Sequence, residues 1–141
     1  ESEEFLDRFS EETDRTLVSF GIMGGIFGEG IDLKNDRLIG AIVVGTGLPQ
    51  ISNERTILKD YYDAENGCGF DYAFRYPGIN KVLQAAGRVI RTTEDTGVIL
   101  LLDERFWQRE YDLLYPREWG DRKPCNIANV GKLVADFWEQ I

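Results

Sequence analysis

The chain has 141 residues, a normal size for one domain, and 43% of them are hydrophobic, which is enough to build a core. Its formal net charge is −9, which argues against a domain that holds DNA through a broad basic surface. There is no histidine and no CxxC pair. We therefore expect no zinc site, no histidine-based catalysis, and reduced thiols at Cys68 and Cys125.

Membrane and export signals are not visible in the sequence. No apolar run reaches the ~18 residues that a membrane-spanning helix needs. The first residues, ESEEF, are acidic and do not resemble a signal peptide. We therefore expect a cytoplasmic protein.

Three apolar runs predict β-strands. They are TLVSFGI at residues 16–22, LIGAIVVGT at residues 38–46 and GVILLLD at residues 97–103. Continuous apolar runs with β-branched residues are typical of strands that are buried on both faces, as in a parallel sheet.

Helical patterns alternate with these runs. Helices are predicted over residues 3–9, 53–64, 77–91 and 104–114. Ser52 can cap the second of them, and Pro77 suits the first turn of the third. An apolar stripe predicts a last helix that carries Val130, Leu133, Val134, Phe137, Trp138 and Ile141.

The alternation of strands and helices predicts an α/β fold, with a parallel sheet and flanking helices. We interpret residues 1–141 as one domain. Three strands are few for an open parallel sheet, so we expect the chain to be part of a larger protein.

The sequence QAAGRVIR, residues 84–91, presents two arginines and a glutamine from one short segment. On a helix at ~100° per residue, Gln84, Arg88 and Arg91 share one stripe. The opposite face is apolar and consists of Ile79, Val82, Leu83, Ala86, Val89 and Ile90. A solvated polar face would favour Glu–Lys pairs, whereas two guanidinium groups with a glutamine suit a polyphosphate and an attacking water. Spacing alone leaves both interpretations open, and Glu94 or Asp95 could pair with Arg91.

A second candidate site is GEGID, residues 28–32. Without side chains at Gly28 and Gly30, backbone N–H groups can approach a phosphate closely. Asp32 could accept a hydrogen bond from a sugar hydroxyl. The alternative is a tight turn in which Asp32 acts as a cap.

Together the two segments resemble motifs V and VI of the superfamily 2 helicases, in the version of the XPD/DinG-like DNA helicases. Motif V would be residues 28–32 and motif VI residues 84–91. The strand that ends near Gly47-Leu48-Pro49 and the later strand GVILLLDERF fit the same pattern. The resemblance covers about residues 16–116 and implies a second RecA-like motor domain.

The resemblance implies a role for each motif residue. Gln84 would lie near the γ-phosphate and the attacking water, while Arg88 and Arg91 would stabilise the transferred phosphoryl, with Arg91 as the arginine finger. Gly30 would bring backbone close to the nucleotide, and Asp32 would contact its ribose or brace an arginine. Gly28 and Glu29 lie where motif V passes from the nucleotide toward DNA.

Several helicase parts are missing from the sequence. It has no GxxxxGK[ST] phosphate loop, no DEAH-like acidic box and no set of four cysteines for an iron–sulfur cluster. The resemblance therefore implies that ATP and Mg²⁺ are bound mainly by a first motor domain, and that any cluster lies upstream. Partners would be that domain and single-stranded or forked DNA, with no metal site in this chain and no ATP hydrolysis by the chain alone. The alternative is an inert scaffold with the same fold.

Aromatic and basic residues outside the motifs carry two further interpretations. Tyr61, Tyr62, Tyr72, Phe74 and Tyr76 either pack in the domain or stack on bases. Arg75 and Lys81 are either solvated or touch DNA phosphate. The stripe of the last helix either packs on this domain's core or docks another domain.

Overall fold

The computed structural model describes residue 4 and residues 7–9, 14–25 and 38–141. The GEGID segment, residues 28–32, lies outside the described residues, as does part of the helix predicted over residues 3–9. Within the described part, no helix combines the length and the apolar character that crossing a bilayer requires.

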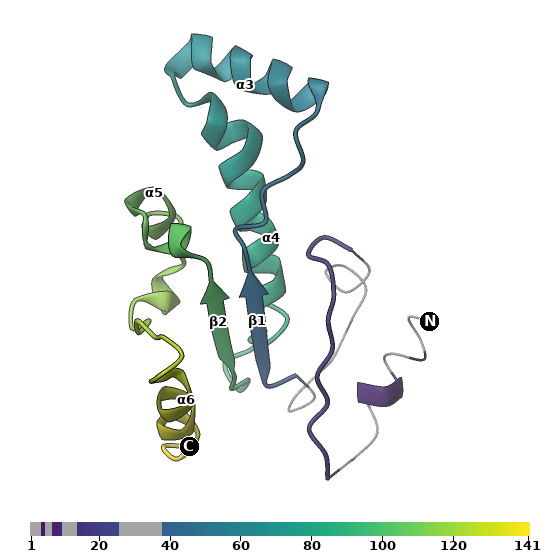
Figure 1. Ribbon diagram of the computed structural model, residues 1–141, viewed down its shortest axis with the longest axis vertical. Helices are drawn as coiled ribbons and strands as arrows, with labels where there is room; N and C mark the ends of the chain where they lie inside the picture. Colours follow the sequence, from purple (N-terminus) through teal and green to yellow (C-terminus); the bar gives the residue numbers. More distant parts are fainter. Residues whose placement is uncertain (1–3, 5–6, 10–13, 26–37) are drawn as a thin grey trace.

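A two-stranded sheet and helix α4 beside it make up the centre of the described fold (Figure 1). In chain order the elements are β1 (Gly40–Val44), α3 (Asn53–Asn66), the π-helical turn η2 (Asp71–Arg75), α4 (Tyr76–Ala86), β2 (Val98–Leu102), the 3-10 turn η3 (Glu104–Trp107), α5 (Arg109–Asp112), the 3-10 turn η4 (Arg117–Trp119) and α6 (Val130–Trp138). β1 and β2 pair in parallel, with Gly40 opposite Val98 and Val44 opposite Leu102. The predicted α/β class is confirmed, and so are the strands predicted in residues 38–46 and 97–103.

The predicted helix over residues 53–64 is α3, and Ser52 caps it as expected. The Ser52 Oγ accepts a hydrogen bond from the backbone N–H of Arg55 at 3.2 Å. Gly67 ends the helix in a left-handed conformation, with φ of 72°, which glycine adopts without steric cost. α3 lies beyond the carboxyl ends of the strands, across the end of the continuous η2–α4 helix, whereas α4 runs back alongside the sheet (Figure 1).

Helix α4 packs its apolar side on the sheet. Ile79 and Val82 join Val43 of β1 in the buried core, together with Phe106 and Tyr111. The contact is close at the start of α4, where a Cβ added at Gly78 would lie 2.7 Å from the backbone oxygen of Thr46. The helix can approach this closely because Gly78 has no side chain.

Residues 16–22 are not a strand, so the prediction of three strands is wrong for the described part of the chain. There, β1 pairs only with β2, and Figure 1 draws residues 16–22 apart from the sheet. Val18 is 69% exposed and Phe20 is 94% exposed. A strand needs a neighbouring backbone to pair with, and the apolar composition on which the prediction rested does not supply one.

Two predicted helices have different bounds in the structure. The helix predicted over residues 77–91 begins earlier, through η2, and ends at Ala86. The helix predicted over residues 104–114 is divided into η3 and α5, because Gln108 adopts an extended backbone between them. This bend allows Phe106 and Tyr111 both to reach the core, with their ring centroids 6.1 Å apart.

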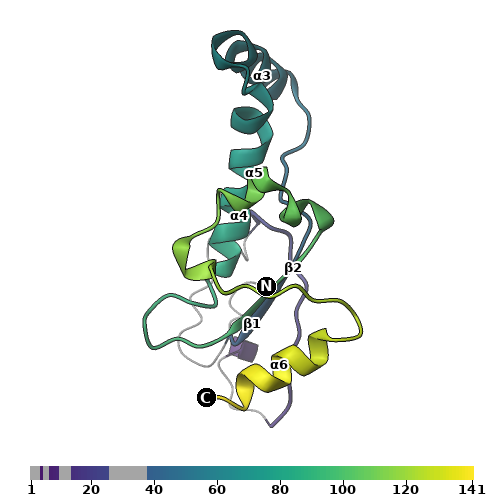
Figure 2. The same cartoon turned by 90° about the vertical axis from the view of Figure 1, so that its left-hand side faces the viewer.

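Helix α6 is the predicted last helix. It lies near the amino-terminal end of the sheet, on the side of β2 (Figures 1 and 2). None of its residues is fully buried, although Leu133, Val134 and Phe137 are half-buried. Its apolar stripe is thus only partly covered by the described residues.

Candidate functional site

The direction of α4 decides at which edge of the sheet the QAAGRVIR segment lies. A helix that links two parallel strands must run antiparallel to them, and α4 does so. It starts beside Thr46, just after β1, and the chain returns to the sheet where Gly97 precedes β2. The candidate site therefore lies at the amino-terminal edge of the sheet.

Residues 84–95, which we call the arginine corner, comprise the end of α4 and the turn that leads to β2. The helical turn tightens here. Gly87 N donates to Leu83 O, four residues earlier, at 2.8 Å, whereas Val89 N donates to Ala86 O, only three residues earlier, at 3.0 Å. Such tightening is common at a helix end. Arg88 and Arg91 therefore lie beyond α4, and the prediction that they share one helical stripe with Gln84 is wrong.

Val89 anchors the arginine corner to the sheet. Its side chain is 3% exposed. A Cβ added at Gly97 would overlap Cγ1 of Val89 and lie 2.9 Å from the backbone oxygen of Ile39. Because Gly97 has no side chain, the arginine corner can pack directly against the start of the sheet. The next residue, Val98, donates its backbone N–H to Ile39 O at 3.0 Å.

The predicted catalytic residues differ in exposure. Gln84 and Arg91 are exposed, whereas Arg88 is half-buried. The three side chains are therefore not equally accessible to solvent. Their side chains belong to one stretch of chain but not to one regular element.

The turn after Arg91 is closed by a carboxylate. Oδ2 of Asp95 accepts hydrogen bonds from the backbone N–H groups of Arg91, at 2.9 Å, and Thr92, at 2.7 Å. Oγ1 of Thr92 accepts a bond from Glu94 N at 3.2 Å. The two bonds from Arg91 and Thr92, together with the charge of Arg91, hold the pKa of the Asp95 carboxyl below its ordinary value. Arg91 therefore has an acidic neighbour within the chain, as the sequence allowed.

Asp95, Thr92 and Gly97 were not among the predicted site residues. The spacing Thr-x-x-Asp at residues 92–95, directly after a helix, is a turn signal that could have identified the first two. The need for a glycine at residue 97 is visible only once Val89 is placed against it.

For the second predicted site, the structure describes only the residues that precede it. Gly28, Glu29, Gly30 and Asp32 lie outside the described residues. The segment just before them is described, and it lies against α4: a Cβ added at Gly24 would lie 3.3 Å from Cε of Lys81.

The tyrosines singled out in the sequence contact one another at the junction of α3 and η2. The rings of Tyr62 and Tyr72 stack with centroids 4.1 Å apart, and Tyr61 and Tyr76 meet them edge to face at 5.1 Å. Phe74 is buried. The packing interpretation fits these contacts, because the stacked faces are already covered by a neighbouring ring.

Arg75 is a packed residue. Its side chain is 16% exposed and pairs with Asp71. Its guanidinium also lies over the rings of Phe70, at 5.3 Å, and Tyr111, at 5.5 Å. The interpretation of Arg75 as a surface group, solvated or on DNA, is therefore wrong.

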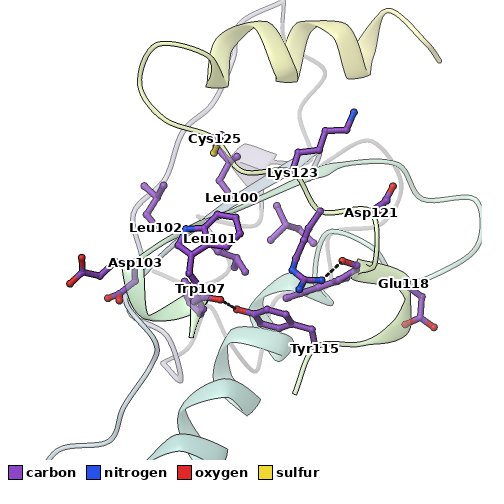
Figure 3. A pocket seen from close by; sticks show the side chains of 15 residues that line it. Leu100, Leu101, Leu102, Asp103, Trp107, Tyr115, Glu118, Asp121, Lys123 and Cys125 are labelled. Carbon is purple, nitrogen blue, oxygen red and sulfur yellow. Dashed lines mark hydrogen bonds between the residues drawn. The ribbon is translucent and has the colours of Figure 1, made fainter. Parts of the chain in front are cut away.

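A cavity of about 440 Å³ borders strand β2 (Figure 3). β2 and Trp107 form one wall, and the chain from Tyr115 to Cys125 forms the other. The hydroxyl of Tyr115 donates to the backbone oxygen of Phe106 at 2.7 Å. The lining shares no residue with the arginine corner.

The donor atoms of the described residues do not fit a metal centre. In this part of the chain, no group of three or more His, Cys, Asp or Glu side chains is placed to hold a metal ion. Cys68 and Cys125 are free cysteines. The described residues therefore do not fit an iron–sulfur cluster, whereas the arginine corner offers cationic groups of the kind that bind phosphate.

Comparisons with known proteins agree with the motifs. Residues 1–122 match the helicase C-terminal domain family. The chain is 32% identical over 137 residues to the ATP-dependent DNA helicase XPD of Sulfolobus acidocaldarius, which covers 90% of this chain and 22% of that protein. It is 30% identical over 113 residues to regulator of telomere elongation helicase 1 of Bos taurus, covering 74% of this chain and 9% of the relative.

A third relative is the ATP-dependent DNA helicase chl-1 of Caenorhabditis elegans, which is 29% identical over 133 residues, 91% of this chain and 16% of the relative. The chain thus spans less than a quarter of the length of these relatives. The family match extends over most of the chain and includes both motifs. The chain therefore belongs to the helicase C-terminal domain family, in its XPD/DinG-type branch.

Proposed function

We propose that this chain is the second motor domain of an ATP-dependent DNA helicase. Its motif V and motif VI residues would face ATP and Mg²⁺ bound mainly on a first motor domain, and hydrolysis would drive translocation on single-stranded DNA. The observation that carries the proposal is the arginine corner: Gln84 and Arg91 are exposed beside a firmly buried anchor, Val89. The family match and the names of the relatives support it.

Each residue of the arginine corner has a proposed task. Arg91 is the arginine finger, and its planar guanidinium suits the charge that develops on a transferred phosphoryl group. Arg88 supports the same charge from its half-buried position. Gln84 orients the attacking water, since its amide can both donate and accept hydrogen bonds.

Motif V has the second set of tasks. By the resemblance, Gly28 and Gly30 bring backbone N–H groups to the nucleotide, Asp32 contacts the ribose or braces an arginine, and Glu29 lies toward the DNA. The approach to this motif, at Gly24, packs beside Lys81 of α4. That contact supports the proposal that motifs V and VI act in one region.

The site proposed here is half of a composite active site. An arginine finger accelerates hydrolysis only when ATP and Mg²⁺ are already held in line for attack. The sequence has neither a phosphate loop nor a DEAH-like acidic box. We therefore expect the isolated chain to bind ATP weakly and not to hydrolyse it.

The test compares the full-length protein with the isolated chain. ATPase rates are measured with and without single-stranded DNA, and ATP binding is measured by calorimetry in the presence of Mg²⁺. Circular dichroism establishes that the isolated chain is folded. The proposal predicts DNA-stimulated turnover for the full-length protein only. Micromolar ATP affinity with Mg²⁺-dependent turnover by the isolated chain, or no ATPase in the full-length protein, would contradict it.

A further inference from the structure

Arg91 lies between two fixed points of the backbone. On one side, Val89 is buried against Gly97. On the other side, the turn formed by residues 91–95 is closed by the carboxylate of Asp95. The side chain of Arg91 is exposed, and the buried Val89 and the Asp95 carboxylate hold the backbone on either side of it.

The two hydrogen bonds to Asp95 fix the backbone at Arg91, the residue whose side chain must be placed accurately for the proposed function. They come from the N–H groups of Arg91 itself and of Thr92, and both end on the single oxygen Oδ2. Residues in a connection between a helix and a strand have few other constraints. A small rotation at the Arg91 Cα is magnified at the guanidinium, which lies at the far end of a long side chain.

We propose that Asp95 is a positioning residue for Arg91, holding the backbone of the arginine corner so that the guanidinium meets the phosphoryl group in line. This inference rests on the proposed function and deepens it. Asp95 acts through Arg91 and does not itself touch the nucleotide. Its requirement is an acceptor oxygen at this position, since one oxygen receives both bonds.

The proposal predicts a specific order among variants of the full-length protein. Asp95→Ala removes the acceptor, and kcat for DNA-stimulated ATP hydrolysis should fall about 10²-fold, the loss expected for a misplacement of about 1 Å. KM for ATP should change little, because the nucleotide is held mainly by the other domain. Asp95→Asn keeps an acceptor oxygen and should recover most of the rate.

Glu94→Ala is the matched control. It removes a carboxylate from the neighbouring exposed position, so the change in charge is the same. Only the backbone N–H of Glu94 takes part in the turn's hydrogen bonds. Its kcat should stay close to that of the wild type. If Glu94→Ala loses as much activity as Asp95→Ala, or if Asp95→Asn is as slow as Asp95→Ala, charge is the cause and the positioning role is overturned.

A double-mutant cycle separates this inference from the proposed function. If Asp95 acts through Arg91, Asp95→Ala should reduce kcat no further in an Arg91→Ala background. Additive losses overturn the positioning role while the arginine finger stands. Normal turnover by Arg91→Ala alone overturns the proposed function and this inference with it.

Melting temperatures decide whether a variant is folded. If Asp95→Ala does not fold, Thr92→Ala takes its place in the same cycle, because it removes the hydroxyl acceptor on the other side of the turn. A smaller loss of kcat, absent in the Arg91→Ala background, supports the inference. An unchanged kcat in Thr92→Ala, together with an inactive Asp95→Asn, overturns it.

Discussion

The two sides of the segment from α4 to β2 meet different surroundings. Ile79, Val82 and Val89 are almost fully buried within this chain, whereas Gln84 and Arg91 are exposed. The apolar side therefore completes its packing here, while the polar side presents its groups outward from a fixed backbone. The apolar side therefore stabilises the fold, and we propose that the arginine corner carries the function.

The strongest test of the apolar side is Ile79→Ala. Ile79 is 3% exposed in the core against Val43, and truncation of a buried Ile costs about 2–5 kcal/mol of unfolding free energy. Denaturant unfolding of the full-length protein measures the loss. Activity should fall only to the extent that the protein unfolds.

Ile57→Ala is the matched control, because the same atoms are removed from a side chain on α3 that is 70% exposed. It should change stability by less than about 0.5 kcal/mol, as surface substitutions usually do. Equal losses at both positions would show that burial on the sheet does not distinguish the two sides.

Gly97→Ala tests the contact that joins the two sides. The new Cβ would overlap Val89 and press on the backbone of Ile39, so we expect a loss of about 1–3 kcal/mol from overpacking and a displaced arginine corner. Melting temperature and kcat should therefore fall together. Gly131→Ala is the control, since nothing lies within 4 Å of its added Cβ in α6; alanine should be neutral or slightly stabilising there.

The smallest expected effect lies outside both regions, at Tyr115. Burial, followed by the neighbouring Tyr111, raises the pKa of Tyr115 to about 12. An unfolded tyrosine titrates near ~10, so the stability that Tyr115 contributes is complete below pH ~10 and is lost as the pH rises toward 12. Tyr115→Phe lacks the hydroxyl that donates to Phe106 O, which is worth about 1 kcal/mol at neutral pH.

The measurement is urea unfolding of wild type and Tyr115→Phe from pH 7 to pH 11.5. The stability difference between them should be constant up to pH ~10 and shrink above it. A difference that does not depend on pH would contradict the raised pKa. ATP turnover at neutral pH should be the same in both proteins, because the tyrosine is not part of the arginine corner.

Much of the fold was predictable because it depends on local patterns. The Ser52 cap, helix α3, the two paired strands and the apolar side of α4 all follow from spacing and composition. The helix end at Ala86 was not predictable in the same way, because it accompanies the packing of Val89 against Gly97, two residues at opposite ends of the connection between α4 and β2. The prediction of a third strand at residues 16–22 was wrong for a similar reason. The segment is apolar enough for a strand, but pairing also needs a neighbouring backbone.

The candidate site shows the same division. Gln84, Arg88 and Arg91 could be selected from the sequence because the motif is contiguous. Their arrangement could not be predicted, because the prediction assumed a helix that continues to residue 91, whereas α4 ends at Ala86. The role of Asp95 depends on which backbone N–H groups its carboxylate meets, and this follows from the turn and not from composition.

The most direct test of the central claim is the ATPase kinetics of Arg91→Ala and Arg91→Lys in the full-length protein with single-stranded DNA. Arg91 is exposed, so its removal should leave the melting temperature nearly unchanged. We predict that kcat falls about 10³-fold in Arg91→Ala with little change in ATP binding, and that Arg91→Lys restores little, because a point charge cannot replace the planar guanidinium. Normal turnover by Arg91→Ala, or loss of activity only through unfolding, would contradict the assignment of Arg91 as the arginine finger.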